Sequence, residues 1–201
     1  MSRECKRVRP TRAETRDRLL DSAARVFSKK GFAQASLDDV AADAGLTKGA
    51  VYSSFESKDA LFFALMKKRI DQRLELIESL GRESQDSMPE AIDRFAEMGR
   101  AQDDWHLLFI EFWSRAVRDP DLHADFVRHR RAARASIARL LQVQSEKLGI
   151  SLPASPDDLA VGLLALSNGM AIERIGDPEE IDEHQFSLAV RLLLRPATGR
   201  Q

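Results

Sequence analysis

Cysteine is almost absent from the sequence: Cys5 is the only one among 201 residues. A single cysteine excludes an intrachain disulfide and a zinc site built from cysteines. The four histidines are scattered, and His123 and His129 lie six residues apart, so they do not share one helical face as metal-binding pairs do. We therefore expect neither a disulfide framework nor a bound metal.

Long apolar runs are also lacking. No run approaches the roughly 20 residues that a membrane-spanning helix needs. The N-terminal stretch has no apolar core of the kind found in signal peptides. These absences predict a protein that works in the cytoplasm and has no membrane partner.

Catalytic signatures are missing as well. The chain contains no G-x-G-x-x-G, P-loop, G-x-S-x-G or H-E-x-x-H motif, and its cysteine is not placed for nucleophilic work. The sequence therefore argues against an enzyme and suggests no cofactor.

Helix-forming residues dominate what is present, and glycine and proline fall mainly at the apparent ends of elements. The pattern predicts an all-α fold of about nine helices, bounded by their start and stop signals. We divide the chain into a basic arm (residues 1–10), a three-helix helix-turn-helix DNA-binding domain (11–56), a long connecting helix (57–80) and a helical ligand-binding and dimerisation domain (81–201).

Charge is distributed unevenly along the chain. Residues 1–30 hold ten Lys or Arg against four Asp or Glu, a net of +6, whereas the whole chain carries −1, which leaves −7 for residues 31–201. A basic N-terminus on a mildly acidic body favours a localised contact with DNA. A merely soluble charged tail is the alternative.

The stretch from Leu37 to Phe55 has the pattern of two short helices joined by a tight turn. Leu37, Val40, Ala41 and Ala44 have the spacing of a short amphipathic helix, which a capping box of Ser36 and Asp39 begins and Gly45 ends. Thr47 is a good cap for a second helix, in which Val51 and Phe55 point inward. Two short helices around a glycine turn form a helix-turn-helix, whose second helix enters the DNA major groove.

The outward face of the second helix carries a cation and several hydroxyl groups, which suit phosphate oxygens and base edges, and Gly49 permits close approach of the backbone. The agreement between caps, turn and face favours this interpretation over an ordinary solvated helical hairpin. The predicted base-edge contacts are Lys48, Gly49 and Ser53, the predicted phosphate anchors are Thr47, Tyr52 and Lys58, and Arg12 and Ser36 complete the predicted DNA-binding set.

The connecting helix supplies one of those anchors. Ser57 is placed to cap a helix that runs to about Leu80 and is roughly 35 Å long. Lys58 lies at its N-terminus, where the helix dipole disfavours a cation unless an anion is nearby. This position predicts a phosphate contact, with a solvated lysine as the alternative.

Residues Arg18 to Met66 resemble the tetracycline-repressor (TetR) family of bacterial transcription regulators. The carrying motif is A-x-x-A-G-[LV]-[ST]-x-G-x-[VLI]-Y-x-x-F followed by S-K, present here as AADAGLTKGAVYSSFESK. The resemblance covers about a quarter of the chain and implies a homodimer that holds a small-molecule effector in its C-terminal domain. Ser54 departs from the aromatic residue or histidine that many members carry.

Aromatic residues cluster in the C-terminal half, where helical spacing puts most of them on one face. Such a stripe fits core packing or the wall of an effector site. The predicted effector-site residues are Phe95, Met98, Trp105, Phe109, Phe112, Trp113, Asn168 and Met170. A second, arginine-rich cluster at residues 128–134 is expected to be a solvated helix face rather than another DNA contact.

The last two predicted helices carry more apolar surface than one domain end should expose. We expect them to pair with their copies in a two-fold four-helix bundle, with burial within the chain as the alternative. The predicted interface residues are Leu159, Leu163, Leu166, Met170, Phe186, Leu192 and Leu193.

Together these patterns predict a homodimeric, ligand-responsive regulator, most simply a repressor, that binds a pseudo-palindromic double-stranded DNA operator and is released by a small, largely apolar effector. The alternatives are a dimeric small-molecule-binding protein and an activator.

Overall fold

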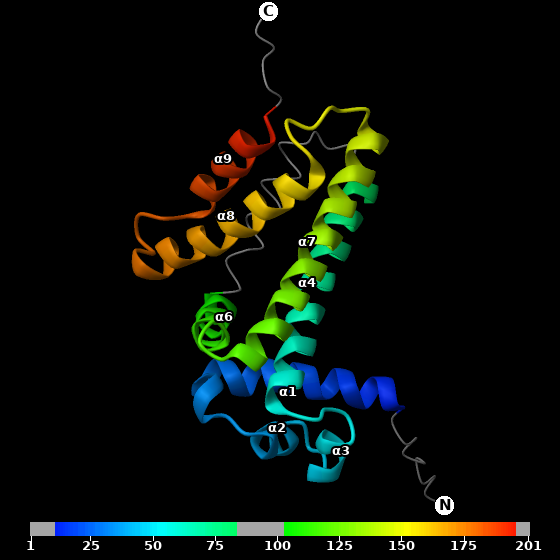
Figure 1. The fold of residues 1–201 in the computed structure, drawn as a ribbon, viewed down its shortest axis with the longest axis vertical. Helices are drawn as coiled ribbons and strands as arrows, with labels where there is room; N and C mark the ends of the chain where they lie inside the picture. The colour runs from blue at the N-terminus through cyan, green and yellow to red at the C-terminus, as the bar shows by residue number, and fades with distance from the viewer. Residues whose placement is uncertain (1–10, 84–102, 196–201) are drawn as a thin grey trace, which may run out of the picture. The chain divides into compact units, whose positions relative to one another are not determined.

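A computed structural model of the protein describes residues 11–83 and 103–195, and these residues form eight α-helices and no strand (Figure 1). The prediction of an all-α fold is confirmed. A further helix expected near residues 87–98 lies outside the described residues. The helices are α1 (Arg12–Gln34), α2 (Leu37–Asp43), α3 (Lys48–Tyr52), α4 (Lys58–Glu83), α6 (Asp103–Ala116), α7 (Pro120–Leu148), α8 (Pro156–Gly176) and α9 (Glu183–Leu194).

The chain divides into two compact units, Met1–Met66 and Lys67–Gln201, and the division falls inside α4. The sequence placed a domain boundary before this helix, at residues 56–57. The difference has a physical reason, because the first turns of α4 belong to the core of the first unit. Leu61, Phe62, Leu65 and Met66 are all buried there.

Three phenylalanine rings form the centre of the first unit. Phe27 and Phe32 from α1 pack edge to face at 5.4 Å between ring centroids, and Phe62 from α4 lies 5.4 Å from Phe32. α1 is bent between the first two rings, where Gly31 adopts a φ of 76°. Glycine tolerates this left-handed backbone, and the bend turns Phe32 back onto the core.

The second unit is a helical bundle in which α8 packs against α6, α7 and α9. Phe109 and Phe112 of α6 face Phe126 of α7, at 6.1 and 6.3 Å between ring centroids. The last described helix, α9, lies beside α8 (Figure 1). Phe186 and Val190 of α9 are buried there.

By length and composition alone, α8 is apolar enough to cross a membrane, the one described helix that is. The sequence predicted no such helix, because it contains no uninterrupted apolar run of about 20 residues. The core helix of a folded domain has the same composition, and α8 contacts three other helices of its own unit. We therefore interpret α8 as a packing helix.

Candidate nucleic-acid interface

Hydrogen-bonded caps fix the helix-turn-helix. The Asp39 N–H donates to Ser36 Oγ (3.1 Å) and the Ser36 N–H donates to Asp39 Oδ2 (3.0 Å), so α2 begins with a reciprocal capping box. Gly45 ends it with a φ of 62°, and the Leu46 N–H then donates to the Ala41 carbonyl (2.9 Å). Thr47 caps α3 through the Ala50 N–H. The predicted capping box, the glycine at the end of α2 and the threonine cap of α3 are therefore all present in the structure.

α3 has one inward and one outward face. Val51 and Phe55 are buried, while Lys48, Gly49 and Ser53 are exposed. Tyr52 is 57% exposed, although a ring of this size usually finds cover in a folded chain. The exposed side of α3 thus presents a cation, a phenol and a hydroxyl group together.

Gly49 lies on this exposed side without a packing reason to be glycine. A Cβ built there would meet only Thr47 Oγ1, at 3.9 Å, and the helical backbone needs no unusual dihedral angle. The residue is therefore free of internal demands, and its small size leaves the α3 backbone open to a partner.

An acidic neighbour holds Lys48. Its ammonium donates to Asp38 Oδ2 in α2, and this hydrogen bond raises the pKa of Lys48. Both side chains are substantially exposed, at 71% and 43%. Sequence reasoning missed Asp38, because it lies ten positions away and on the other helix. A DNA contact by Lys48 would therefore compete with this ion pair.

The serines after α3 are partly engaged. Ser53 Oγ and Ser54 Oγ both donate to the Ala50 carbonyl, at 3.0 and 2.8 Å. Their oxygen atoms keep lone pairs for a donor, so Ser53 can accept from a base edge more readily than donate to it.

Arginines of α1 brace the same region, which the sequence did not reveal. Arg16 donates to the Ser54 carbonyl (2.8 Å) and its guanidinium lies 4.2 Å from the centroid of the Phe55 ring. Arg18 donates to the Ala44 carbonyl at the end of α2 (2.8 Å). Arg12, in the first turn of α1, is exposed, as a DNA-contacting residue must be.

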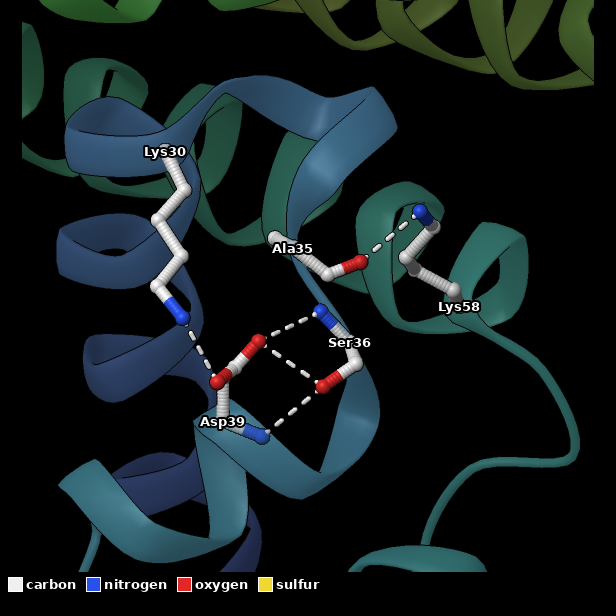
Figure 2. A network of polar contacts seen from close by, with 5 residues as sticks. All are labelled: Lys30, Ala35, Ser36, Asp39 and Lys58. Atoms are coloured by element: carbon white, nitrogen blue, oxygen red, sulfur yellow. Dashed lines mark hydrogen bonds and ion pairs between the residues drawn. The ribbon is translucent and has the colours of Figure 1, made fainter.

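Lys58 faces the backbone of its own unit. Its ammonium donates to the carbonyls of Phe32 (2.7 Å), Ala33 (3.2 Å) and Ala35 (2.9 Å) and lies 4.5 Å from the centroid of the Phe32 ring. Figure 2 shows the bond to Ala35, next to the cap of α2. An ammonium has three N–H donors, and all three are used. The geometry gives Lys58 a capping role at the end of α1, in place of the phosphate contact proposed from its position.

A second polar network holds the start of α2 from the other side. Asp39 accepts from Lys30 Nζ (2.6 Å) as well as from Ser36 (Figure 2). The hydrogen bond from Lys30, followed by those from Ser36, lowers the pKa of Asp39 to about 2. The Ser36 hydroxyl, predicted to contact DNA, is thus already part of the cap.

The predicted effector-site residues divide in two. Phe109 and Phe112 are buried against Phe126, which is core packing. Trp105 is partly buried and Trp113 is 47% exposed. Asn168 is partly buried, and Met170 packs against α9. Phe95 and Met98 lie outside the described residues.

Most predicted interface residues are used within the chain. Leu163, Leu166 and Met170 pack against the buried Phe186 and Val190. Leu159 is 3% exposed, and Leu193 lies 3.3 Å from the Cβ position of Gly162. Leu192, at 60%, is the exposed member of the set. Other apolar side chains of α8 and α9 are exposed instead: Val161, Ile172 and Leu188.

Comparison with known families identifies the class of protein that this fold and this helix-turn-helix define. Residues 19–65 match the family "Bacterial regulatory proteins, tetR family", and residues 85–195 match "BetI-type transcriptional repressor, C-terminal". The chain belongs to the TetR family. It is a DNA-binding transcriptional regulator with a helix-turn-helix, in a family of regulators and not of enzymes.

Individual relatives share mainly the DNA-binding unit. AcrR of Shigella flexneri is 47% identical over 49 residues, which are 24% of this chain and 23% of AcrR. The chain spans 18 to 26% of the length of the first curated relatives it matches. The activator FasR of Mycolicibacterium smegmatis is 25% identical over 86% of this chain and 77% of its own.

The fold recurs in FadR of Bacillus subtilis, solved in complex with stearoyl-CoA. The TM-score is 0.64 at 15% identity, over 89% of this chain and 97% of that one.

Proposed function

We propose that the chain works in the cytoplasm as a homodimeric, ligand-responsive repressor that binds a pseudo-palindromic operator. The observation that carries this proposal is the exposed side of α3, where Lys48, Gly49, Tyr52 and Ser53 stand outward over a buried Val51. Two such helices related by two-fold symmetry would enter successive major grooves about 34–36 Å apart. Arg12 and Thr47 would contact the flanking phosphates.

The exposed apolar side chains of α8 and α9 support a dimer. Leu188 and Leu192 lie one turn apart on α9, and Val161 and Ile172 lie three turns apart on α8. Their exposed fractions range from 48 to 60%. A second copy of the chain would bury them in a four-helix bundle. We propose these four residues as the centre of the interface.

An activator is the second candidate. FasR, the relative aligned over most of this chain, is an activator. The match of residues 85–195 to a repressor C-terminal region favours repression. A reporter placed behind the operator separates the two, because deletion of a repressor raises expression and deletion of an activator lowers it.

Release from DNA requires a ligand that prefers one conformation of the protein over the other. The effector must bind the DNA-incompetent conformation more tightly than the DNA-binding one, since equal affinity shifts no population. The stearoyl-CoA complex of FadR supports an effector site within this fold. The effector would bind in the second unit and act through α4, which is shared by both units.

Substitution of Lys48 tests the DNA-binding face. We expect Lys48→Ala to weaken operator binding by about tenfold or more, because it removes a direct contact worth about 1–3 kcal/mol. The operator would be selected from genomic fragments, and binding measured by fluorescence anisotropy at matched salt. Lys67→Ala is the control, since Lys67 is equally exposed and also paired with an aspartate. Equal affinities for the wild type and Lys48→Ala would remove Lys48 from the interface.

Substitution of Leu192 tests the dimer. Leu192→Glu places a charge in the proposed interface, and we expect monomers in sedimentation and loss of high-affinity operator binding. Leu107→Glu on α6, where the leucine is 51% exposed, should leave the dimer intact. Dimers that persist in Leu192→Glu would place the interface elsewhere.

A further inference from the structure

The carboxylate of Asp38, in the first turn of α2, contributes little to its own helix. The capping box of α2 uses Asp39, which also places a negative charge at the helix N-terminus. In the part of the chain that the structure describes, Asp38 Oδ1 is buried and has no hydrogen-bond partner. A buried oxygen atom without a donor costs free energy of folding. The local fold therefore has little use for a second carboxylate at this position.

The other oxygen of Asp38 lies beside the exposed side of α3. Asp38 Oδ2 accepts from the Lys48 ammonium at 2.5 Å, and both side chains are substantially exposed. Because Oδ1 is buried, any contact that the carboxylate makes outside the chain must use Oδ2. The ammonium keeps two further N–H donors and Oδ2 keeps a lone pair. The ion pair therefore presents a donor and an acceptor side by side.

A G·C base pair has the matching arrangement on its major-groove edge. Guanine O6 and N7 accept hydrogen bonds, and the neighbouring cytosine N4 amino group donates one. O6 and N4 are joined by an N–H···O hydrogen bond of the base pair, so they lie about 2.9 Å apart. This spacing is close to that of Lys48 Nζ and Asp38 Oδ2. Lys48 can therefore donate to guanine while Asp38 accepts from cytosine, with the ion pair still formed.

Other partners on DNA fit the ion pair less well. In an A·T pair the adenine N6 donor lies between two acceptors, N7 and thymine O4, and the thymine methyl group borders O4. A carboxylate placed at N6 would face an acceptor on each side. A phosphate offers acceptors alone, so it attracts Lys48 but repels Asp38. The competition between DNA and the ion pair is thus smallest at a G·C pair.

We propose that Asp38 is a specificity-determining residue: its Oδ2 accepts a hydrogen bond from cytosine N4 while Lys48 donates to the guanine of the same base pair. This inference rests on the proposed contact between Lys48 and the operator, and it adds to the interface a residue of α2. The carboxylate also offsets the charge of Lys48, which weakens the attraction of α3 for DNA of any sequence. Asp38 thus favours the operator and disfavours unrelated DNA.

The test uses the full chain and operator duplexes selected by the wild type from genomic fragments, with each base pair exchanged in turn. Affinities are measured by fluorescence anisotropy at matched salt. We expect one G·C position in each half-site where exchange to A·T weakens wild-type binding by about tenfold or more, and a penalty of about threefold or less in Asp38→Ala. Affinity of Asp38→Ala for an unrelated duplex should rise, because the variant lacks a negative charge near the phosphates. A merely misfolded variant would instead lose affinity for both duplexes.

A modified operator tests the donor atom itself. The cytosine at that position is replaced by 2-pyrimidinone, an analogue that lacks the N4 amino group. The replacement should weaken binding by the wild type about fivefold more than binding by Asp38→Ala. Any change in the duplex itself is common to both proteins and cancels in this comparison.

Two further variants serve as controls. Asp71→Ala should keep the wild-type penalty, since Asp71 is as exposed as Asp38 and pairs with Lys67 over the same distance. Asp38→Asn keeps the size of the side chain but should also lose the preference, because an amide can donate as well as accept. Circular dichroism verifies that each variant is folded.

Three results would overturn the proposal: a wild type without such a G·C position, folded Asp38→Ala and Asp38→Asn that keep the full penalty, or an analogue that weakens the wild type and Asp38→Ala equally. Unchanged operator affinity in Lys48→Ala would count against the proposed function. Weakened binding by Lys48→Ala together with a full penalty in Asp38→Ala would count against the role of Asp38 alone.

Discussion

The two units use their cations in different ways. In the first unit, Arg16, Arg18 and Lys58 donate hydrogen bonds to backbone carbonyls at helix ends. Arg16 and Lys58 also lie over aromatic rings, as Arg69 and Arg130 do in the second unit. A hydrogen bond to a carbonyl is directional and fixes a backbone, whereas cation–π contact tolerates sliding across a ring. The hydrogen bonds to carbonyls therefore fix the backbone of the first unit at helix ends, whereas the contacts of Arg69 and Arg130 hold aromatic side chains.

The substitution with the largest expected effect tests whether the two units unfold independently. Phe62 is fully buried among the rings of the first unit. Phe62→Ala should destabilise that unit by about 3–5 kcal/mol, through lost burial and the cavity left behind. Because both tryptophans belong to the second unit, thermal unfolding followed by circular dichroism should begin earlier, while the tryptophan transition stays in place.

Phe112→Ala provides the reciprocal control, since Phe112 is fully buried in the second unit. It should move the tryptophan transition and leave operator binding by the folded protein near the wild-type value. A tryptophan transition that shifts equally in Phe62→Ala would show that the units unfold together.

Substitution of Lys58 has a smaller expected effect and distinguishes a residue that stabilises the fold from one that contacts DNA. Lys58→Met keeps the length of the side chain but leaves three carbonyls without their donor, which should cost the first unit about 2 kcal/mol. Operator affinity should fall while its dependence on salt concentration stays unchanged, because no phosphate contact is lost. Lys48→Ala, in contrast, should reduce the preference for the operator over unrelated DNA, because Lys48 is predicted to contact base edges.

Lys58→Arg sharpens this distinction. It retains a cation that can reach carbonyl groups, so part of the affinity should return. A salt slope that falls by about one contact in Lys58→Met would restore the phosphate assignment made from sequence.

In the first unit, the features that the sequence predicted depend on contacts between residues close together in the chain. Ser36, Gly45 and Thr47 act within a few residues of themselves, so their spacing alone predicted the caps and the turn. Lys58 acts on carbonyls 23 to 26 residues away. Its position at a helix N-terminus suggested an anion, but carbonyl oxygens of the folded chain satisfy the same requirement.

The second unit was less predictable because its helices are apolar on several sides. On α8, residues 163 and 166, which the sequence predicted to face a partner, pack against α9 of the same chain and are only partly buried. Periodicity cannot rank the faces of a helix that is apolar almost all round.

The smallest expected effect concerns the cap of α2, where a titratable group fixes the first unit. Hydrogen bonds from Lys30 and then Ser36 lower the pKa of Asp39 from 3.8 to about 2. A carboxylate with a lowered pKa stabilises the folded state at pH values above 3.8, and this contribution is lost as the pH falls towards 2. Acid titration by circular dichroism should therefore show a loss of stability in this interval that Asp39→Asn reduces.

Glu14 and Asp43 also have lowered pKa values in this unit, so the difference between wild type and Asp39→Asn isolates the cap of α2. Lys30→Gln removes the first cause but keeps Ser36, and it should raise the pKa of Asp39 and move the loss to higher pH. Carbon-13 resonances of the carboxyl group give that pKa directly. An Asp39 that titrates near 3.8 in the wild type would mean that the bond from Lys30 does not persist in solution, and the cap of α2 would rest on Ser36 alone.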